Sequence, residues 1–202
     1  MLDYIRIGCA VPEVKVADVQ KNVAGILEMM EKADHQGVDL LVFPELAVTG
    51  YTCADLFFQD ALWNAVKSGL AQIVTAGKQY PHLNVVVGLP VRYERKLYNC
   101  AAFISGGKLL GMVPKTYLSR GENRWFSSGA ELDEIRAGWD VLSFDIFGNY
   151  DFGTDVLFRI GGVNVGIEIC EDLFATVPVS SGLALNGADV IVNPAASFEL
   201  AG

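Results

Sequence analysis

Short apolar runs alternate with helix-like patterns along the first half of the chain. The β-rich segment "YIRIGCAV" (4–11) predicts a strand. Asp18 can cap a following helix, in which apolar residues recur every three to four positions from Val19 to Ala33 before Gly37 ends the pattern. The continuous apolar run "VDLLVFPE" (38–45) is typical of a strand that is covered on both faces.

The rest of the chain repeats these patterns. A second helix is predicted over residues 58–79, before Pro81, and another near 177–186. Glycine-containing turns at 105–107 and 161–162 each separate two strand-like segments and predict two hairpins. The predicted strands are "NVVVGLPV" (84–91), "YNCAAFI" (98–104), "KLLGMVP" (108–114), "DVLFRI" (155–160), "VNVGIEIC" (163–170) and "ADVIVNPAAS" (188–197).

This order of elements predicts one layered α/β domain over residues 1–202. The chain has 51% hydrophobic and 19% charged residues, a balance typical of a globular protein with a substantial core. It stops at Gly202 directly after a strand, without a closing helix, so we expect the domain to continue beyond this point. The "SGGK" segment at 105–108 is read as a hairpin turn, because a phosphate-binding loop would open a helix.

Charge and cysteine usage narrow the possible partners. The chain carries 24 acidic and 15 basic residues, for a net charge of −9, without a basic stripe, which argues against nucleic-acid or acidic-membrane partners. The sequence has neither a signal-peptide pattern nor a long apolar run, and we expect a cytoplasmic protein. The cysteines lack metal-site spacing, so no metal is expected, and Cys9, Cys53 and Cys100 are interpreted as structural core thiols.

Three polar residues follow apolar strands at the positions where α/β sheets usually place their sites. They are Glu45, Lys115 and Cys170. A carboxylate can take a thiol proton and return it to a leaving amine, while an ammonium stabilises both a thiolate and an oxyanion. The backbone N–H of Glu171 could supply a second oxyanion donor. The alternative for Cys170 is a buried strand thiol, and the acidic residues beside it would oppose its ionisation.

Five segments in order resemble the nitrilase, or carbon–nitrogen hydrolase, superfamily, and within it the glutaminase domains of glutamine-dependent NAD+ synthetases. The segments are "FPELAVTGYTCADLF", "VPKTYL", "RWFSSG", "GIEICEDLF" and "NPAASF". The resemblance covers essentially the whole chain and implies an αββα sandwich. It also implies a catalytic triad of Glu45, Lys115 and Cys170, in which the cysteine attacks the side-chain amide of glutamine and forms a thioester.

The resemblance implies further site residues. Glu122 matches a second glutamate that orients the triad, and Glu171 matches an acid that binds the substrate amino group. Ser197 matches a serine that lines the same pocket, and Tyr51 is expected close by. The segment "TYLSRGEN" between Lys115 and "RWF" is shorter than the family pattern and lacks its tyrosine and phenylalanine, so the physiological amide is left open.

The resemblance also implies partners outside this chain. A C-terminal synthetase domain would use the released ammonia to convert deamido-NAD+ to NAD+, and ATP, Mg²⁺ and deamido-NAD+ are expected on that domain alone, with no cofactor on this one. A homo-oligomer is expected as well. Two alternatives stay open: a stand-alone amidase or N-carbamoyl amidase of the same superfamily, and a catalytically silent oligomerisation scaffold.

Overall fold

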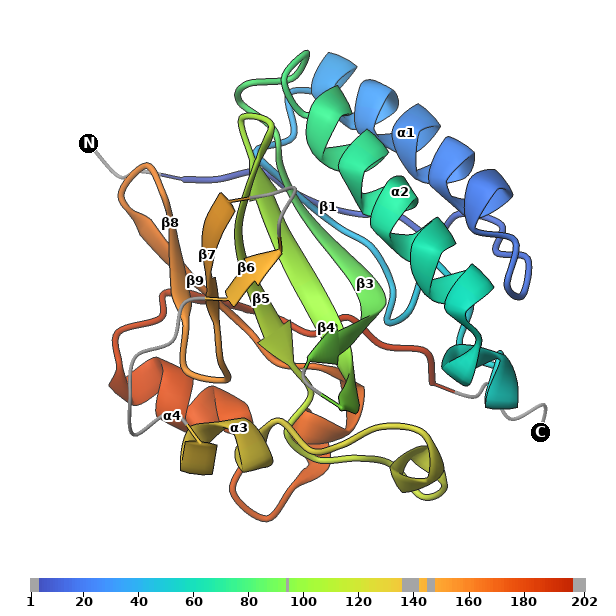
Figure 1. Cartoon of the computed structure of the whole chain (residues 1–202). Helices are drawn as coiled ribbons and strands as arrows, with labels where there is room; N and C mark the ends of the chain where they lie inside the picture. Colours follow the sequence, from blue (N-terminus) through green and yellow to red (C-terminus); the bar gives the residue numbers. More distant parts are fainter. Residues whose placement is uncertain (1–3, 94, 136–141, 145–147, 198–202) are drawn as a thin grey trace, which may run out of the picture.

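Two β-sheets packed face to face form the centre of the computed structural model, and helices cover their outer faces (Figure 1). The structure describes residues 4–93, 95–135, 142–144 and 148–197. This helix–sheet–sheet–helix layering agrees with the layered α/β domain that the sequence pattern predicts and with the αββα sandwich that the family resemblance implies.

The larger sheet has the strand order β1-β2-β3-β4-β5-β7-β6. β1, β2 and β3 are parallel, whereas β4 is antiparallel to both β3 and β5. β5 therefore runs in the same direction as β2, and the carboxyl ends of these two strands lie at the same edge of the sheet. The bounds are β1 (Ile7–Cys9), β2 (Leu40–Val42), β3 (Asn84–Tyr93), β4 (Lys96–Ser105), β5 (Lys108–Pro114), β6 (Leu142–Phe144) and β7 (Gly148–Phe152).

The smaller sheet packs against one face of the larger sheet. It contains β8 (Leu157–Ile160), β9 (Val163–Ile167) and β10 (Val190–Val192) in the order β10-β9-β8. Aliphatic residues of both sheets fill the space between them, and the rings of Phe103 and Phe158 stack across it with centroids 4.2 Å apart. The 3₁₀ helix η3 (Cys170–Phe174) and helix α4 (Val179–Leu185) follow β9 in the chain.

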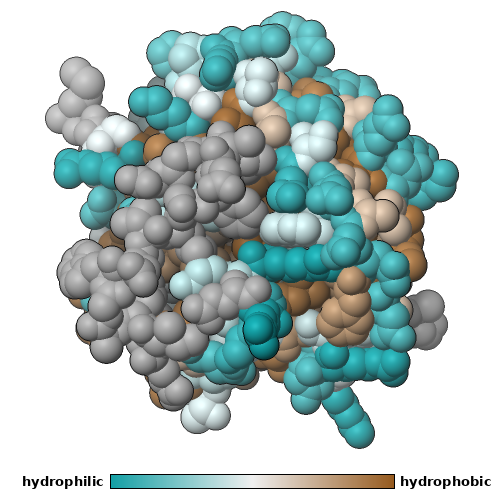
Figure 2. All heavy atoms as spheres, viewed as in Figure 1, coloured by the Kyte–Doolittle hydropathy of each residue, from teal (hydrophilic) through white to brown (hydrophobic). Residues whose placement is uncertain are grey.

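Helices α1 (Val19–His35) and α2 (Asp60–Ala76) pack on the other face of the larger sheet (Figure 1). Asp18 caps α1 by accepting a hydrogen bond from the backbone N–H of Lys21, as predicted. Hydrophilic residues cover most of the outward face of these helices (Figure 2). The remaining helical segments are η1 (Ala54–Phe58), η2 (Glu122–Arg124) and the short α3 (Ala130–Ile135). No helix in the described part of the chain is long and apolar enough to cross a bilayer.

The sequence predictions are confirmed for the helices α1, α2 and α4 and for both glycine-turn hairpins. Three features differ from them. The third strand extends to Tyr93 and turns directly into β4, so a further hairpin joins them, and the sequence did not predict β6, β7 or α3. Cys53 and Cys100 are buried as expected, but Cys9 is exposed, because it lies on a short strand at the edge of the sheet.

Candidate active site

The fold places the three candidate residues just beyond the ends of three strands. Glu45 follows β2, Lys115 follows β5 and Cys170 opens η3 after β9. The turn that carries Glu45 lies directly on β3, where only a glycine fits. A Cβ atom at Gly88 would stand 2.3 Å from the backbone nitrogen of Leu46 and 2.5 Å from the carbonyl oxygen of Pro44.

Lys115 lies between two carboxylates in the interior. Its Nζ is 2.7 Å from Oε1 of Glu45 and 2.7 Å from Oε2 of Glu122. All three residues are no more than 3% exposed. Charged side chains are rarely buried unless they are paired. The structure pairs Lys115 with Glu122, the residue that matches the triad-orienting glutamate in the family resemblance.

Asn99 completes this cluster from β4. Its Nδ2 donates to Oε1 of Glu45 at 2.7 Å and to Oε1 of Glu122 at 3.2 Å. The backbone joins the same elements, because the N–H of Lys115 donates to the carbonyl of Asn99 at 2.8 Å. Asn99 was not among the site residues predicted from the sequence. The signal was a polar residue inside the apolar run "LYNCAAFI".

The environments of the two carboxyl groups separate their pKa values. Burial raises the pKa of Glu45 above its usual value, against the opposing effect of the Lys115 ammonium. Burial also acts on Glu122, but hydrogen bonds and the charge of Lys115 outweigh it and lower the pKa. For Lys115 burial disfavours the charged form, yet both acids together raise its pKa. Glu45 is therefore the acid that more readily takes a proton, as a general base must.

Cys170 stands at a sharp bend between β9 and η3. Its φ of 48° lies in the left-handed region, which residues other than glycine rarely adopt and which is enriched at active sites. The backbone N–H of Cys170 donates to the carbonyl of Pro194, and Asn193 Nδ2 lies 3.4 Å from the carbonyl of Cys170. The loop after β10 therefore holds the cysteine in this conformation.

The same loop connects Cys170 to Glu45. The backbone N–H of Ala196 donates to Oε2 of Glu45 at 3.2 Å, and Oγ of Ser197 lies 3.8 Å from the sulfur of Cys170. Burial raises the pKa of the Cys170 thiol, and the charge of Glu45 raises it further, against the effects of Lys115 and Ser197. Burial and Glu45 therefore favour the neutral thiol, and the sulfur is electrostatically coupled to both other candidate residues.

The other predicted residues surround this centre. The Tyr51 hydroxyl lies 3.0 Å from Oγ of Ser119, and burial raises the pKa of Tyr51 to about 12. Glu171 is half-buried in the first turn of η3, where helix N–H groups lack an intrahelical partner. The neighbouring acid, Asp172, is structural. Its carboxyl accepts the backbone N–H groups of Ile169, Thr116 and Tyr117 and so ties η3 to the segment after Lys115.

Metal ligands do not gather in the described residues, where no group of three or more His, Cys, Asp or Glu side chains could hold an ion. What the geometry offers instead is a thiol, a buried carboxylate with a raised pKa and a buried ammonium. These are the groups of a cysteine-dependent hydrolase in which a glutamate, rather than a histidine, acts as the general base.

A comparison with protein families identifies the family of the chain. The carbon–nitrogen hydrolase family model matches residues 6–201, and the chain belongs to that family. The chain is 35% identical over 198 residues to the glutamine-dependent NAD(+) synthetase of Mycobacterium tuberculosis and 30% identical to that of Xylella fastidiosa. These matches cover 94% and 98% of this chain but only 28% and 32% of the relatives' lengths.

Solved structures give the same result. The crystal structure of a glutamine-dependent NAD(+) synthetase from Cytophaga hutchinsonii superposes with a TM-score of 0.80 at 31% identity, covering 96% of this chain and 31% of that one. An amidase from Nesterenkonia sp. shares the fold, with a TM-score of 0.74 at 19% identity over 95% of this chain and 64% of its own. The chain is thus a carbon–nitrogen hydrolase domain related to glutamine-dependent NAD(+) synthetases, and it shares its fold with an amidase.

Proposed function

We propose that this domain hydrolyses the side-chain amide of glutamine through a thioester on Cys170. The observation that carries the proposal is the buried Glu45–Lys115 pair, joined electrostatically and through the 193–197 loop to the cysteine. The names of the relatives that match nearly the whole chain support glutamine as the amide. The released ammonia would then serve a synthetase domain of the kind that those longer proteins are named for.

The first half of the proposed reaction forms the thioester. Glu45 accepts the thiol proton of Cys170 while the sulfur attacks the amide carbon. The ammonium of Lys115 has three N–H donors, of which two go to the carboxylates, and the third can face the developing oxyanion together with the backbone N–H of Glu171. When the C–N bond breaks, Glu45 returns the proton to the leaving nitrogen, and ammonia departs.

The second half regenerates the enzyme. Glu45 takes a proton from water, whose oxygen attacks the thioester carbon, and the C–S bond then breaks. The proton returns from Glu45 to the sulfur, and glutamate is released. In this scheme Glu171 and Ser197 contact the substrate and Tyr51 lies beside them, while Glu122 keeps Lys115 in place. Because the thiol needs to ionise only during attack, the raised pKa of Cys170 is compatible with catalysis.

A second candidate is an amidase acting on another small amide. The fold shared with the Nesterenkonia amidase and the short segment after Lys115 favour this alternative. The test is ammonia release by the purified chain from glutamine, asparagine and a simple aliphatic amide. We expect glutamine to be the best substrate, and a preference for the aliphatic amide would replace the first proposal by the second.

The Cys170→Ala variant tests the mechanism itself. We expect ammonia release to fall by more than about a thousandfold, because no other group can form the thioester, while the thermal unfolding midpoint stays close to that of the wild type. Cys100→Ala is the matched control: it removes a buried thiol of β4 and should retain the hydrolysis. Undiminished ammonia release by Cys170→Ala would contradict the thioester mechanism.

A further inference from the structure

Asn99 lies within a run of eight buried residues of β4, and its side chain reaches two acids at once. Its Nδ2 donates to Oε1 of Glu45 at 2.7 Å and to Oε1 of Glu122 at 3.2 Å. Because carboxylates only accept hydrogen bonds, these contacts fix which end of the amide faces them. Asn99 and Lys115 are therefore two donors that each bridge the same pair of acids, and the four side chains form a closed ring.

The two oxygens of Glu45 are held differently by this ring. Oε1 accepts from both Lys115 and Asn99. Oε2 accepts the backbone N–H of Ala196, at a longer 3.2 Å, on the loop that carries Ser197 beside the sulfur of Cys170. The side-chain donors thus occupy Oε1, and Oε2 is the oxygen on the side of the cysteine.

We propose that Asn99 is a positioning residue for amide hydrolysis: it holds Oε1 of Glu45 so that Oε2 takes and returns the Cys170 proton. This inference rests on the triad mechanism proposed above. An amide suits the task because it donates two hydrogen bonds without adding charge. An aspartate would set a third carboxylate beside one ammonium, and an aliphatic residue would leave Lys115 as the sole side-chain donor to Oε1.

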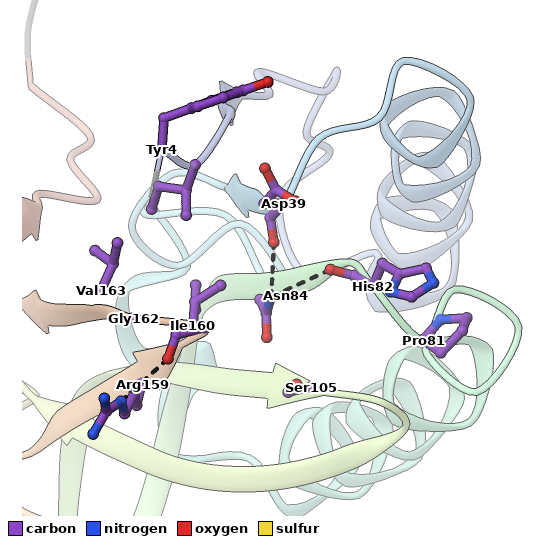
Figure 3. Close-up of a pocket in the computed structure, with 12 residues that line it drawn as sticks. Tyr4, Asp39, Pro81, His82, Asn84, Ser105, Arg159, Ile160, Gly162 and Val163 are labelled. Atoms are coloured by element: carbon purple, nitrogen blue, oxygen red, sulfur yellow. Dashed lines mark hydrogen bonds between the residues drawn. The ribbon is translucent and has the colours of Figure 1, made fainter. Parts of the chain in front are cut away.

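A second observation supports a role beyond stability. The Oδ1 atom of Asn99 is buried and has no hydrogen-bond partner among the described residues. An unsatisfied buried acceptor is unfavourable, so packing alone would favour an apolar residue here. Asn84 offers a matched comparison on β3. It is also buried, and its Nδ2 also lies near two acceptors, the carbonyls of Asp39 at 2.8 Å and His82 at 3.3 Å (Figure 3). Asn84 opens β3, whereas Asn99 lies opposite Pro90 toward the other end of that strand.

The test compares Asn99→Leu and Asn99→Asp with the control Asn84→Leu, using the pH profile of kcat/KM for ammonia release. The reaction needs ionised Glu45, so activity falls as pH decreases through the pKa of this group. The Asn99 hydrogen bond lowers that pKa, and its loss in Asn99→Leu should move the acid limb to higher pH by about one unit and leave KM nearly unchanged. The charged groups that face Glu45 are Lys115 and Glu122, with Tyr51 and Cys170 nearby.

The order of the two Asn99 variants separates positioning from packing. Asn99→Asp is nearly isosteric, so a packing role predicts that it is milder than Asn99→Leu. The positioning role predicts the reverse, with a larger shift of the acid limb in Asn99→Asp because a third negative charge disfavours ionisation of Glu45. Asn84→Leu should lower the unfolding midpoint and leave the pH profile in place. An unmoved acid limb in folded Asn99→Leu, or an equal shift in Asn84→Leu, would overturn the inference.

A substrate-independent measurement keeps this test separate from that of the proposed function. Alkylation of Cys170 by iodoacetamide also requires transfer of the thiol proton, and its rate can be followed against pH by mass spectrometry. We expect the acid limb of alkylation to move in the same direction in Asn99→Leu. If the wild type releases no ammonia from glutamine but this shift is present, the glutamine assignment fails and the role of Asn99 stands; a missing shift removes the role of Asn99.

Discussion

The β3–β4 pair carries one buried asparagine toward each end, and the two are used differently. At the end near Lys115, Asn99 donates to two ionisable carboxyl groups that share a buried ammonium. At the other end, Asn84 donates to the backbone carbonyls of Asp39 and His82 (Figure 3). The same residue type therefore has two uses. Asn99 holds the charged groups of the candidate site, and Asn84 holds backbone carbonyl groups.

Open space is also present at the Asn84 end, away from the candidate site. The Asn84 end borders a cavity of about 740 Å³ between the two sheets, lined by residues that include Asp39, Ser105 and Arg159. Its polar groups are largely engaged locally: Asp39 accepts the backbone N–H of Arg6, and Arg159 donates to the carbonyl of Gly161. The comparison teaches that coupled, buried titratable groups identify the candidate site, whereas the presence of a cavity alone does not.

Removal of the ammonium that the two acids share should have the largest combined effect on stability and hydrolysis, and it acts at the Asn99 end. Lys115→Met leaves Glu45 and Glu122 buried without a counter-charge, so we expect a loss of about 3–5 kcal/mol in unfolding free energy, together with a fall in hydrolysis of about 10²–10³-fold. Without the lysine, both acids should have raised pKa values in the folded state. The folded variant then binds more protons than the unfolded chain, and its stability should decrease as pH rises.

Urea unfolding at pH 5 and pH 8 measures this effect, with the double variant Lys115→Met/Glu122→Gln as its control. The double variant carries one buried acid fewer and should recover part of the lost stability, mostly at pH 8. A Lys115→Met protein that unfolds at the same urea concentration as the wild type would show that the cluster is not held by this charge.

Gly88→Ala should have a smaller effect at the same end of the molecule. The new methyl group would meet the backbone of the turn that carries Glu45, which cannot move aside as a flexible side chain can. We expect a destabilisation of about 1–3 kcal/mol and a fall in kcat/KM of about 10–100-fold, since small displacements of a catalytic group are costly. Thermal unfolding and ammonia release measure the two effects.

Gly182→Ala is the matched control for this substitution. Gly182 lies in α4, where an added Cβ would have no neighbour within 4 Å, so alanine should leave activity unchanged and increase stability by about 0.5–1 kcal/mol. Wild-type hydrolysis by Gly88→Ala would mean that the turn tolerates displacement and that the position of Glu45 is less constrained than the structure indicates.

The sequence could predict those parts of the site that are marked by a local sequence pattern. Glu45, Lys115 and Cys170 each follow an apolar strand. The family resemblance implied that Glu122 orients the triad, and the structure has Glu122 paired with Lys115. Gly88 also had a signal, a glycine inside the strand "NVVVGLPV", which often marks a close backbone approach. The roles assigned to Tyr51, Glu171 and Ser197 stay predictions, although all three lie around the cluster.

The role of Asn99 could not be predicted because its partners are distant in sequence. It lies 54 positions from Glu45 and 23 from Glu122, and only the antiparallel return of β4 brings the three together. The same limit applies to Cys9. Its β-rich segment predicts a buried strand, but the position of that strand at the sheet edge, which decides the exposure, depends on long-range pairing. The strands β6 and β7 are short and lack a clear alternating pattern, so periodicity does not predict them.

The smallest effect is expected at the Asn84 end, from Arg159→Ala. Arg159 is exposed, and its Nε donates to the carbonyl of Gly161, two residues away in the β8–β9 turn (Figure 3). Removal of such a side chain should change the unfolding free energy by less than about 0.5 kcal/mol and leave kcat/KM for ammonia release at the wild-type value. Both are measured with the assays used for Gly88→Ala. If hydrolysis falls severalfold in a folded Arg159→Ala protein, the two ends of the β3–β4 pair are energetically coupled, and the cavity in Figure 3 takes part in the function of the site.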